Sequence, residues 1–287
     1  MNTVIEQMLS NYEINNIEDE KNAIKEILQE IILSALSKVG FFQNAVFCGG
    51  TALRIFYRLE RFSEDLDFSL VSPDSNFNID KYLPRVVERV KEYGLNLELQ
   101  TNRRNDDDKV VKSAFLKANT VEQLLYFNSS FDIKGIRKEE KIKIKLEVDT
   151  NPPAGGEYET KMGILPEIYD VKIYDSKSLF AGKIHSILGR FWDNRVKGRD
   201  LYDFLFYVAR NTKVNIKFLE NAMKQSGHLK EDDYLDLPKI KELLKNKFNE
   251  LDYRLAVEDT LPFIKNKKEL DKWGKGLFVA VTDMINE

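Results

Sequence analysis

Residues 45–70 carry the most restrictive pattern in this chain, because four short segments of different character follow one another without a spacer. The apolar run Ala45–Cys48 predicts a buried strand. The sequence G-G-T at 49–51 predicts a turn, and Ala52–Leu59 has the composition and spacing of a helix. Asp65–Leu70 alternates polar and apolar residues, which predicts a second strand.

Two kinds of chemistry meet in this stretch. A glycine pair before a helix lets phosphate approach the backbone, where the helix N-terminus offers free N–H groups and partial positive charge. Gly49, Gly50 and Thr51 therefore form a candidate phosphate-binding turn. Asp65 and Asp67 are expected to share one strand face, and two carboxylates kept together are usually neutralised by a metal ion.

A third carboxylate is expected from the segment Lys141–Asp149, whose strict alternation predicts a strand with one polar face. Glu147 is the first choice on that face and Asp149 the second. With Asp65 and Asp67, it would complete a site for Mg²⁺ or Mn²⁺. In a two-metal site, one ion activates an attacking hydroxyl and the other stabilises departing pyrophosphate. Each pattern also has an ordinary interpretation, as a plain turn or as the solvated face of a strand.

Length and composition restrict the class of protein. The apolar runs are far too short to cross a membrane, and the first residues lack the order of a signal peptide. One cysteine excludes an intrachain disulfide, and two histidines exclude a His/Cys zinc cage. We therefore expect a soluble, cytoplasmic protein with oxygen ligands for any metal. A net charge of −3 argues against non-specific coating of nucleic acid.

The chain changes character near Asp175, from mixed strands and helices to amphipathic helices alone. This order predicts an α/β (α+β) domain with a mixed sheet at 1–175 and an all-helical bundle at 176–287. Helices are predicted at Glu18–Val39, Asp80–Tyr93, Ser176–Phe191, Arg199–Ala209, Ile216–Gln225, Leu237–Phe248, Tyr253–Ile264 and Leu270–Ile285, and further strands at Leu95–Leu99 and within 112–131 and 158–174. Ser176 or Ser178 is the expected cap of the first helix of the bundle.

The combination of G-G-T, thirteen intervening residues and D-L-D-F resembles the nucleotide-binding motif of polymerase-β-like nucleotidyltransferases. More narrowly, G-G-T-A-L-R at 49–54 with R-F-S-E-D-L-D-F at 61–68 is similar to the first motif of the AbiEii-type toxin family. Those proteins are nucleotidyltransferase-like toxins of type IV toxin–antitoxin and abortive-infection systems. K-L-E-V-D at 145–149 resembles the second motif. Lys183, followed by G-R-D-L-Y-D at 198–203, resembles the third.

The resemblance implies a polymerase-β-like nucleotidyltransferase domain that transfers a nucleoside monophosphate from an NTP and releases pyrophosphate. Asp65, Asp67 and Glu147 would bind metal, and Lys183 would contact the triphosphate. Similar family members use the acceptor end of tRNA, so the resemblance favours an RNA acceptor. It implies no obligate protein partner, because type IV antitoxins are thought to counteract the effect of the toxin.

Asp200 and Asp203 are three residues apart, so they share a helix face and could orient Lys183 or an arginine. With the lysine they would complete the nucleotide site. The alternative is an ordinary salt-bridge network between helices. His185 lies two residues beyond Lys183 and therefore on another face of the helix, so we do not expect it to act as a catalytic base.

Arg61 and Ser63 flank the carboxylates and are further candidates for nucleotide contacts. For Arg61, the alternative is a surface ion pair with Glu60 or Glu64. Cys48 is expected in the core. Core packing is also the preferred interpretation, over base stacking, of a group of aromatic residues: Phe191, Trp192, Phe204, Phe206 and Tyr207.

A run of basic residues leads into the candidate third carboxylate: Lys134, Arg137, Lys138, Lys141, Lys143 and Lys145. Such a run suits an RNA backbone, but lysines also protect exposed strand edges. Two rival functions remain open: a transferase with a small-molecule or protein acceptor, and a module that binds NTP without turnover.

Overall fold

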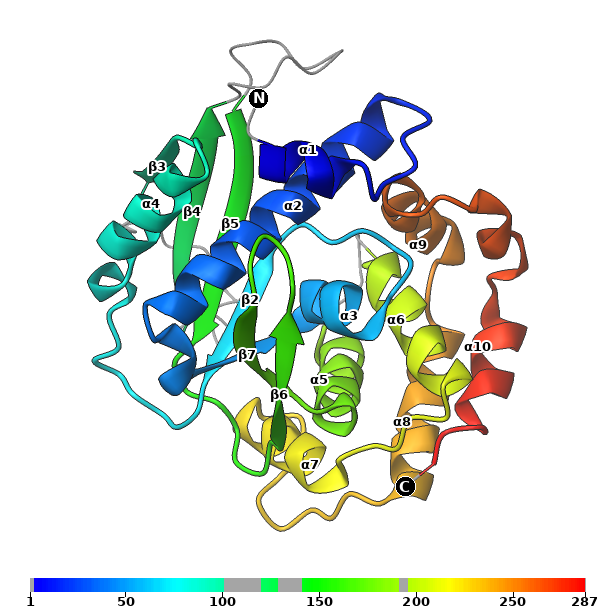
Figure 1. Cartoon of the computed structure of the whole chain (residues 1–287). Coiled ribbons are helices and arrows are strands. Elements are labelled where there is room, and N and C mark those ends of the chain that lie inside the picture. Colours follow the sequence, from blue (N-terminus) through cyan, green and yellow to red (C-terminus); the bar gives the residue numbers. More distant parts are fainter. Residues whose placement is uncertain (1–2, 101–119, 129–140, 191–195, 287) are drawn as a thin grey trace, which may run out of the picture. The chain divides into compact units, whose positions relative to one another are not determined.

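The computed structural model of the chain describes residues 3–100, 120–128, 141–190 and 196–286 (Figure 1). They divide into two compact units. The first contains residues 1–58, 62–152 and 160–173. The second contains residues 59–61, 153–159 and 174–287. The long stretch of the second unit begins at residue 174, next to the division predicted at Asp175. Two short earlier segments, 59–61 and 153–159, also join this unit, so a single division at Asp175 stays a prediction.

The first unit contains a sheet and four helices. Its helices are α1 (Thr3–Leu9), α2 (Ile17–Lys38), α3 (Gly49–Tyr57) and α4 (Leu83–Glu92), with 3₁₀ turns at Phe41–Gln43 and Ile79–Lys81. The strands are β1 (Ala45–Cys48), β2 (Leu66–Leu70), β3 (Leu97–Gln100), β4 (Thr120–Asn128), β5 (Lys141–Asp149), β6 (Tyr158–Gly163) and β7 (Tyr169–Tyr174). The last two strands begin or end in the second unit.

The seven strands form one mixed sheet in the order β3-β4-β5-β2-β1-β7-β6. β1 pairs with β2 antiparallel and with β7 parallel, while β2 pairs with β5 parallel. The prediction of a mixed sheet is therefore confirmed. β1 and β5 lie at the centre of this arrangement on either side of β2, so the sequence motif occupies the middle of the sheet.

The apolar residues of the strands face α1, α2 and α4, which lie across one side of the sheet (Figure 1). On β2, Leu66, Phe68 and Leu70 join this core, and on β5 Leu146 and Val148 do so. The polar residues between them must therefore point to the opposite side, because successive strand residues alternate between the two faces.

The second unit is helical. It consists of α5 (Ser176–Gly189), α6 (Gly198–Ala209), α7 (Ile216–Gln225), α8 (Leu237–Asn249), α9 (Tyr253–Thr260) and α10 (Lys275–Thr282), with 3₁₀ turns at Leu261–Phe263 and Lys267–Lys272. Its core is aromatic. The Phe180 ring stacks on the Tyr207 ring with 4.7 Å between their centroids, and the Phe204 and Phe248 rings meet edge to face with 5.1 Å between their centroids. Core packing is thus confirmed for Phe204 and Tyr207, whereas Phe191 and Trp192 lie outside the described residues.

Two details of the helical half were predicted wrongly. The cap of α5 is Asp175, whose carboxylate accepts the Ser178 N–H at 2.8 Å, rather than Ser176 or Ser178. The long helix expected at Leu270–Ile285 is a 3₁₀ turn followed by α10, and Gly274 separates the two. Within the described residues, none of the helices combines the length and the apolarity that a membrane crossing needs.

Gly198 offers a test of packing in the second unit. A Cβ there would overlap the Ala256 carbonyl and the Thr260 hydroxyl, whereas a Cβ on Gly182, in α5, would meet no atom within 4 Å. We expect Gly198→Ala to lower the free energy of unfolding by about 1–3 kcal/mol, as overpacking does. Gly182→Ala should leave it unchanged or raise it by up to about 1 kcal/mol. Urea titration measures both, and equal effects would contradict the packing described.

Candidate active site

The first turn of α3 is fixed directly to the residue before β2. Residues 49–51, which were predicted as a turn before the helix, are the first residues of α3. The Thr51 hydroxyl donates to the Asp65 carbonyl at 2.5 Å. Gly49 has a φ of +77°, and a Cβ on it would lie only 2.8 Å from the carboxyl carbon of Asp67. Only glycine satisfies both conditions, because other residues rarely adopt this φ and all carry a Cβ. The Asp67 carboxylate therefore lies against the first residue of α3.

Asp67 belongs to a row of side chains that runs across four neighbouring strands. It lies opposite Cys48 on β1 and opposite Glu147 on β5, and Glu147 lies opposite Glu122 on β4. Residues paired in this way project from the same face of a sheet, about 4.8 Å apart from strand to strand. The side chains of Asp67, Glu147 and Glu122 thus project from neighbouring strands on the face opposite the apolar core.

Glu122 was missed in the sequence, although a signal for it existed. The predicted strand within 112–131 had no assigned bounds, so its polar positions could not be paired with those of Lys141–Asp149. The order T-V-E at 120–122 puts Glu122 on the face opposite Val121, but the signal is short because Gln123 and Leu124 break the alternation. Only the antiparallel register with β5 then places it beside Glu147.

Lys145 connects the two carboxylates at the end of this row. Its ammonium group contacts the Glu147 carboxylate directly and the Glu122 carboxylate at 3.2 Å. Burial lowers the pKa of Lys145, but the hydrogen bonds and charges of Glu147 and Glu122 outweigh burial and raise the pKa above its ordinary value. Lys145 therefore remains charged and neutralises part of the acidic row.

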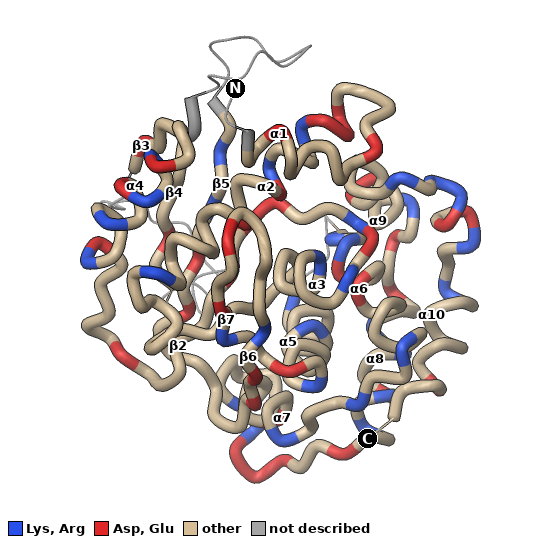
Figure 2. The backbone as a smooth tube through the Cα atoms, in the orientation of Figure 1, with Lys and Arg blue, Asp and Glu red and all other residues tan. Residues whose placement is uncertain are grey.

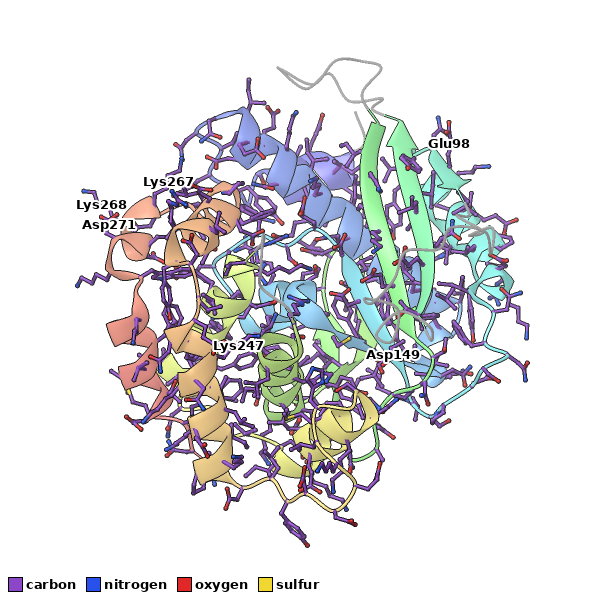
Figure 3. All side chains as sticks on the ribbon, turned by 180° about the vertical axis from the view of Figure 1, so that it is seen from behind. Glu98, Asp149, Lys247, Lys267, Lys268 and Asp271 are labelled. Carbon is purple, nitrogen blue, oxygen red and sulfur yellow. The ribbon has the colours of Figure 1, made fainter. Side chains whose placement is uncertain are left out.

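The two other predicted carboxylates lie outside this row. β2 begins at Leu66, so Asp65 precedes the strand instead of starting it. The predicted start of this strand was therefore wrong by one residue. Asp149 lies at the end of β5 (Figure 3), where its side chain accepts the Asn151 N–H at 3.0 Å. Burial raises the pKa of the Asp149 carboxyl. Among described residues, no three His, Cys, Asp or Glu side chains are grouped closely enough to hold a metal ion.

The third motif forms a buried ionic cluster in the second unit. Arg61 donates to the Asp203 carboxylate through Nε at 2.6 Å and Nη2 at 2.7 Å. Lys183 Nζ lies 2.7 Å from both Asp200 Oδ1 and Asp203 Oδ2, and Arg190 contacts the other oxygen of Asp200. The spacing of the two aspartates therefore orients Lys183 and an arginine, as predicted.

Burial and charge act in opposite directions on this cluster. Burial raises the pKa of Asp203, but Arg61 and Lys183 outweigh it and hold the pKa below its usual range. Burial lowers the pKa of Lys183. The charge and hydrogen bond of Asp203 only partly compensate, since the charges of Arg61 and Arg190 lower the pKa further. Arg61 is 3% exposed, so the alternative of a surface ion pair for this residue was wrong. The salt-bridge network between helices is present.

The remaining predicted residues have simpler surroundings. The Ser63 carbonyl accepts from Gln29 at 3.1 Å. Cys48 is only partly buried and belongs to the acidic row, which corrects the expected core position. His185 contacts the Ser226 hydroxyl at 2.9 Å, and burial with nearby positive charge lowers its pKa to about 4. Figure 2 shows basic positions along β5, whereas Lys134, Arg137 and Lys138 lie outside the described residues.

A protein family and several solved structures match this chain. The family model described as nucleotidyl transferase AbiEii toxin, type IV toxin–antitoxin system, matches residues 31–274. The fold is similar to MenT4, a nucleotidyltransferase toxin from Mycobacterium tuberculosis, with a TM-score of 0.54, 17% identity, and coverage of 99% of this chain and 89% of that one. JHP933 from Helicobacter pylori gives a TM-score of 0.49 at 18% identity, over 92% of this chain and 91% of that one. No curated protein matches the sequence.

The family match extends over most of the chain and identifies a nucleotidyltransferase. The chain belongs to the AbiEii family of nucleotidyltransferase toxins of type IV toxin–antitoxin systems. Its reaction is therefore the transfer of a nucleoside monophosphate from an NTP, as the sequence motifs predicted.

Gly49→Ala tests the contact between the turn and the acidic row. The new methyl group would displace the Asp67 carboxylate, so we expect nucleotide transfer to fall by about 10²-fold or more. Gly227→Ala is the matched control, since Gly227 has a φ of +74° but nothing within 4 Å of a Cβ. It should cost about 1 kcal/mol of stability and leave transfer intact. A fully active Gly49→Ala enzyme would contradict the site.

Proposed function

We propose that the protein uses a divalent metal, Mg²⁺ or Mn²⁺, to transfer a nucleoside monophosphate to the 3′ end of an RNA, with tRNA as the preferred class. The observation that carries this proposal is the contact between Gly49 and Asp67. A carboxylate that can hold a metal lies beside a helix N-terminus that can hold phosphate. A bound triphosphate carries its metal on the phosphates, so the metal ligand and the phosphate-binding backbone must lie next to each other.

Asp67 and Glu147 are suitable metal ligands. Their carboxylates stand side by side on neighbouring strands, and hard oxygen donors are what these ions prefer. Asp65, one residue before β2, is the proposed third ligand. Asp149, which accepts the N–H of Asn151, is the alternative to Glu147. When bound, the metal supplies charge neutralisation and an activated hydroxyl.

The other predicted residues act on the nucleotide in this proposal. Gly49, Gly50 and Thr51 offer backbone N–H groups at the start of α3 to the phosphates. A further set of polar residues would support the nucleotide: Arg61, Ser63, Lys183, Asp200 and Asp203. Asp203 keeps Lys183 and Arg61 in place, and the lysine ammonium is a compact point charge suited to a phosphate.

A basic position beside the acidic row supports an RNA acceptor. Lys143 is exposed on β5, on the same strand face as Glu147, and suits a phosphate backbone. Lys145, counted in the same basic run, is engaged with Glu147 and Glu122 instead. A transferase with a small-molecule or protein acceptor and a non-catalytic NTP-binding module are the rival functions.

One labelling experiment separates these functions. Purified protein is incubated with each α-³²P-labelled NTP and total cellular RNA, with Mg²⁺, with Mn²⁺ or with EDTA. We expect label in RNA of tRNA size, and only when metal is present. Removal of the 3′-terminal nucleotide should release this label. Label in protein or in a small product would support another acceptor, and NTP binding without pyrophosphate release would support the binding module.

Asp67→Asn is the critical variant in that assay. It keeps the shape of the side chain but removes the charge, so we expect transfer to fall by about 10²-fold or more. Asp170→Asn is the matched control, because Asp170 is an exposed aspartate on β7 of the same sheet. If Asp67→Asn and Asp170→Asn label RNA equally well, the proposed role of Asp67 is wrong.

Lys145 makes a second prediction possible, with binding alone as the measurement. Because its ammonium group neutralises Glu147, it competes with a metal for that carboxylate. Lys145→Met should therefore tighten Mn²⁺ binding by about 3–10-fold in the absence of NTP, measured by electron paramagnetic resonance. Lys143→Met, two residues away on the same face, should leave binding nearly unchanged. Weaker Mn²⁺ binding by Lys145→Met would show that Lys145 supports the metal instead of opposing it.

A further inference from the structure

β6 is the last strand of the sheet, and among the described strands it pairs only with β7. Its apolar side chains are poorly covered: Tyr158 is 49% exposed and Met162 is 61% exposed. An edge strand presents unpaired backbone N–H and C=O groups, which makes it a template for another strand. The combination of an open edge with exposed apolar side chains marks β6 as an interaction surface.

The sequence of this strand is complementary to itself. In Y-E-T-K-M at 158–162, the residues on either side of Thr160 have opposite charges, and the next residues outward are both large and apolar. In an antiparallel pair of two such strands centred on Thr160, each Glu159 lies opposite Lys161 of the other copy. Each Tyr158 lies opposite Met162, and the two Thr160 residues lie opposite each other.

We propose that two copies of this chain pair through β6, antiparallel and centred on Thr160, so that their sheets join across a two-fold axis. Two opposite-charge pairs and two tyrosine–methionine contacts then form at once, and each kind of pair stabilises neighbouring strands. Such an interface is isologous and closed, because the same edge is used by both copies.

The charge pattern selects a second copy over an unrelated strand. Lysine on a strand edge normally opposes edge pairing, since it meets no partner there. In the proposed pair Glu159 of the other copy lies opposite Lys161, but only in a strand with this sequence and this register. Lys161 already lies with its ammonium group 4.9 Å from the centre of the Tyr57 ring, on the side of β6 that carries Glu159. The interface is short, so the dimer is expected to form reversibly and to depend on concentration.

Charge reversal gives a specific test by sedimentation equilibrium, from about 1 µM to about 1 mM protein. The wild-type chain should pass from monomer to dimer within this range. Glu159→Lys and Lys161→Glu each place like charges opposite one another twice, so each variant alone should dimerise about 10-fold more weakly. An equimolar mixture of the two variants should recover wild-type association, because every pair across the interface is again of opposite charge.

Glu157→Lys is the matched control. Glu157 is exposed and precedes the paired segment, and in the proposed register it meets only Gly163 of the second copy, so association should not change. Thermal melting of each variant shows that the chains remain folded. A wild-type chain that stays monomeric up to about 1 mM would overturn the proposal. So would a mixture of the two variants that associates no better than either variant alone.

Discussion

The contact between Gly49 and the Asp67 carboxylate is the constraint on which the rest of the site depends. It requires a left-handed backbone at the end of β1, a strand immediately beside β1, and a polar residue on that strand opposite Cys48. Once these are satisfied, the antiparallel pairing of β1 and β2 and the parallel pairing of β2 and β5 bring Glu147 next to Asp67. The position of the acidic row is thus a result of sheet register, which the turn helps to hold.

The row carries its own counter-charge. Several carboxylates on one face of a sheet repel each other, and the free energy of this repulsion would otherwise oppose folding. Lys145 lies two residues before Glu147 and therefore on the same face of β5. Its positive charge reduces the repulsion. In the helical unit, the repulsion between two buried aspartates, Asp200 and Asp203, is offset by three basic side chains: Arg61, Lys183 and Arg190. There the charges are removed from water, so the loss of one partner would leave a buried charge uncompensated.

The local elements could be predicted because their signals are local. β1, β5 and α7 have the predicted bounds, since apolar periodicity and flanking turns mark them. The close succession of β1, α3 and β2 was likewise readable from spacing, although residues 49–51 begin α3 instead of forming a separate turn. What could not be read was register: Glu122 becomes a neighbour of Glu147 only through the pairing of β4 with β5, and nothing in a single strand specifies that pairing. The buried pair of Arg61 with Asp203 joins residues 142 positions apart, so the sequence left open whether Arg61 contacts a phosphate or forms a surface ion pair, and did not reveal this partner.

The segment 59–61 has a further consequence for how such a chain can change. It lies inside the first motif, between α3 and β2, yet it belongs to the helical unit through Arg61. A recombination event that exchanged only the sequence after Asp175 would therefore deliver Asp203 without the arginine that neutralises it. Asp203 in the helical half needs Arg61, which the N-terminal half encodes. We therefore expect the two halves to evolve together and not as interchangeable modules.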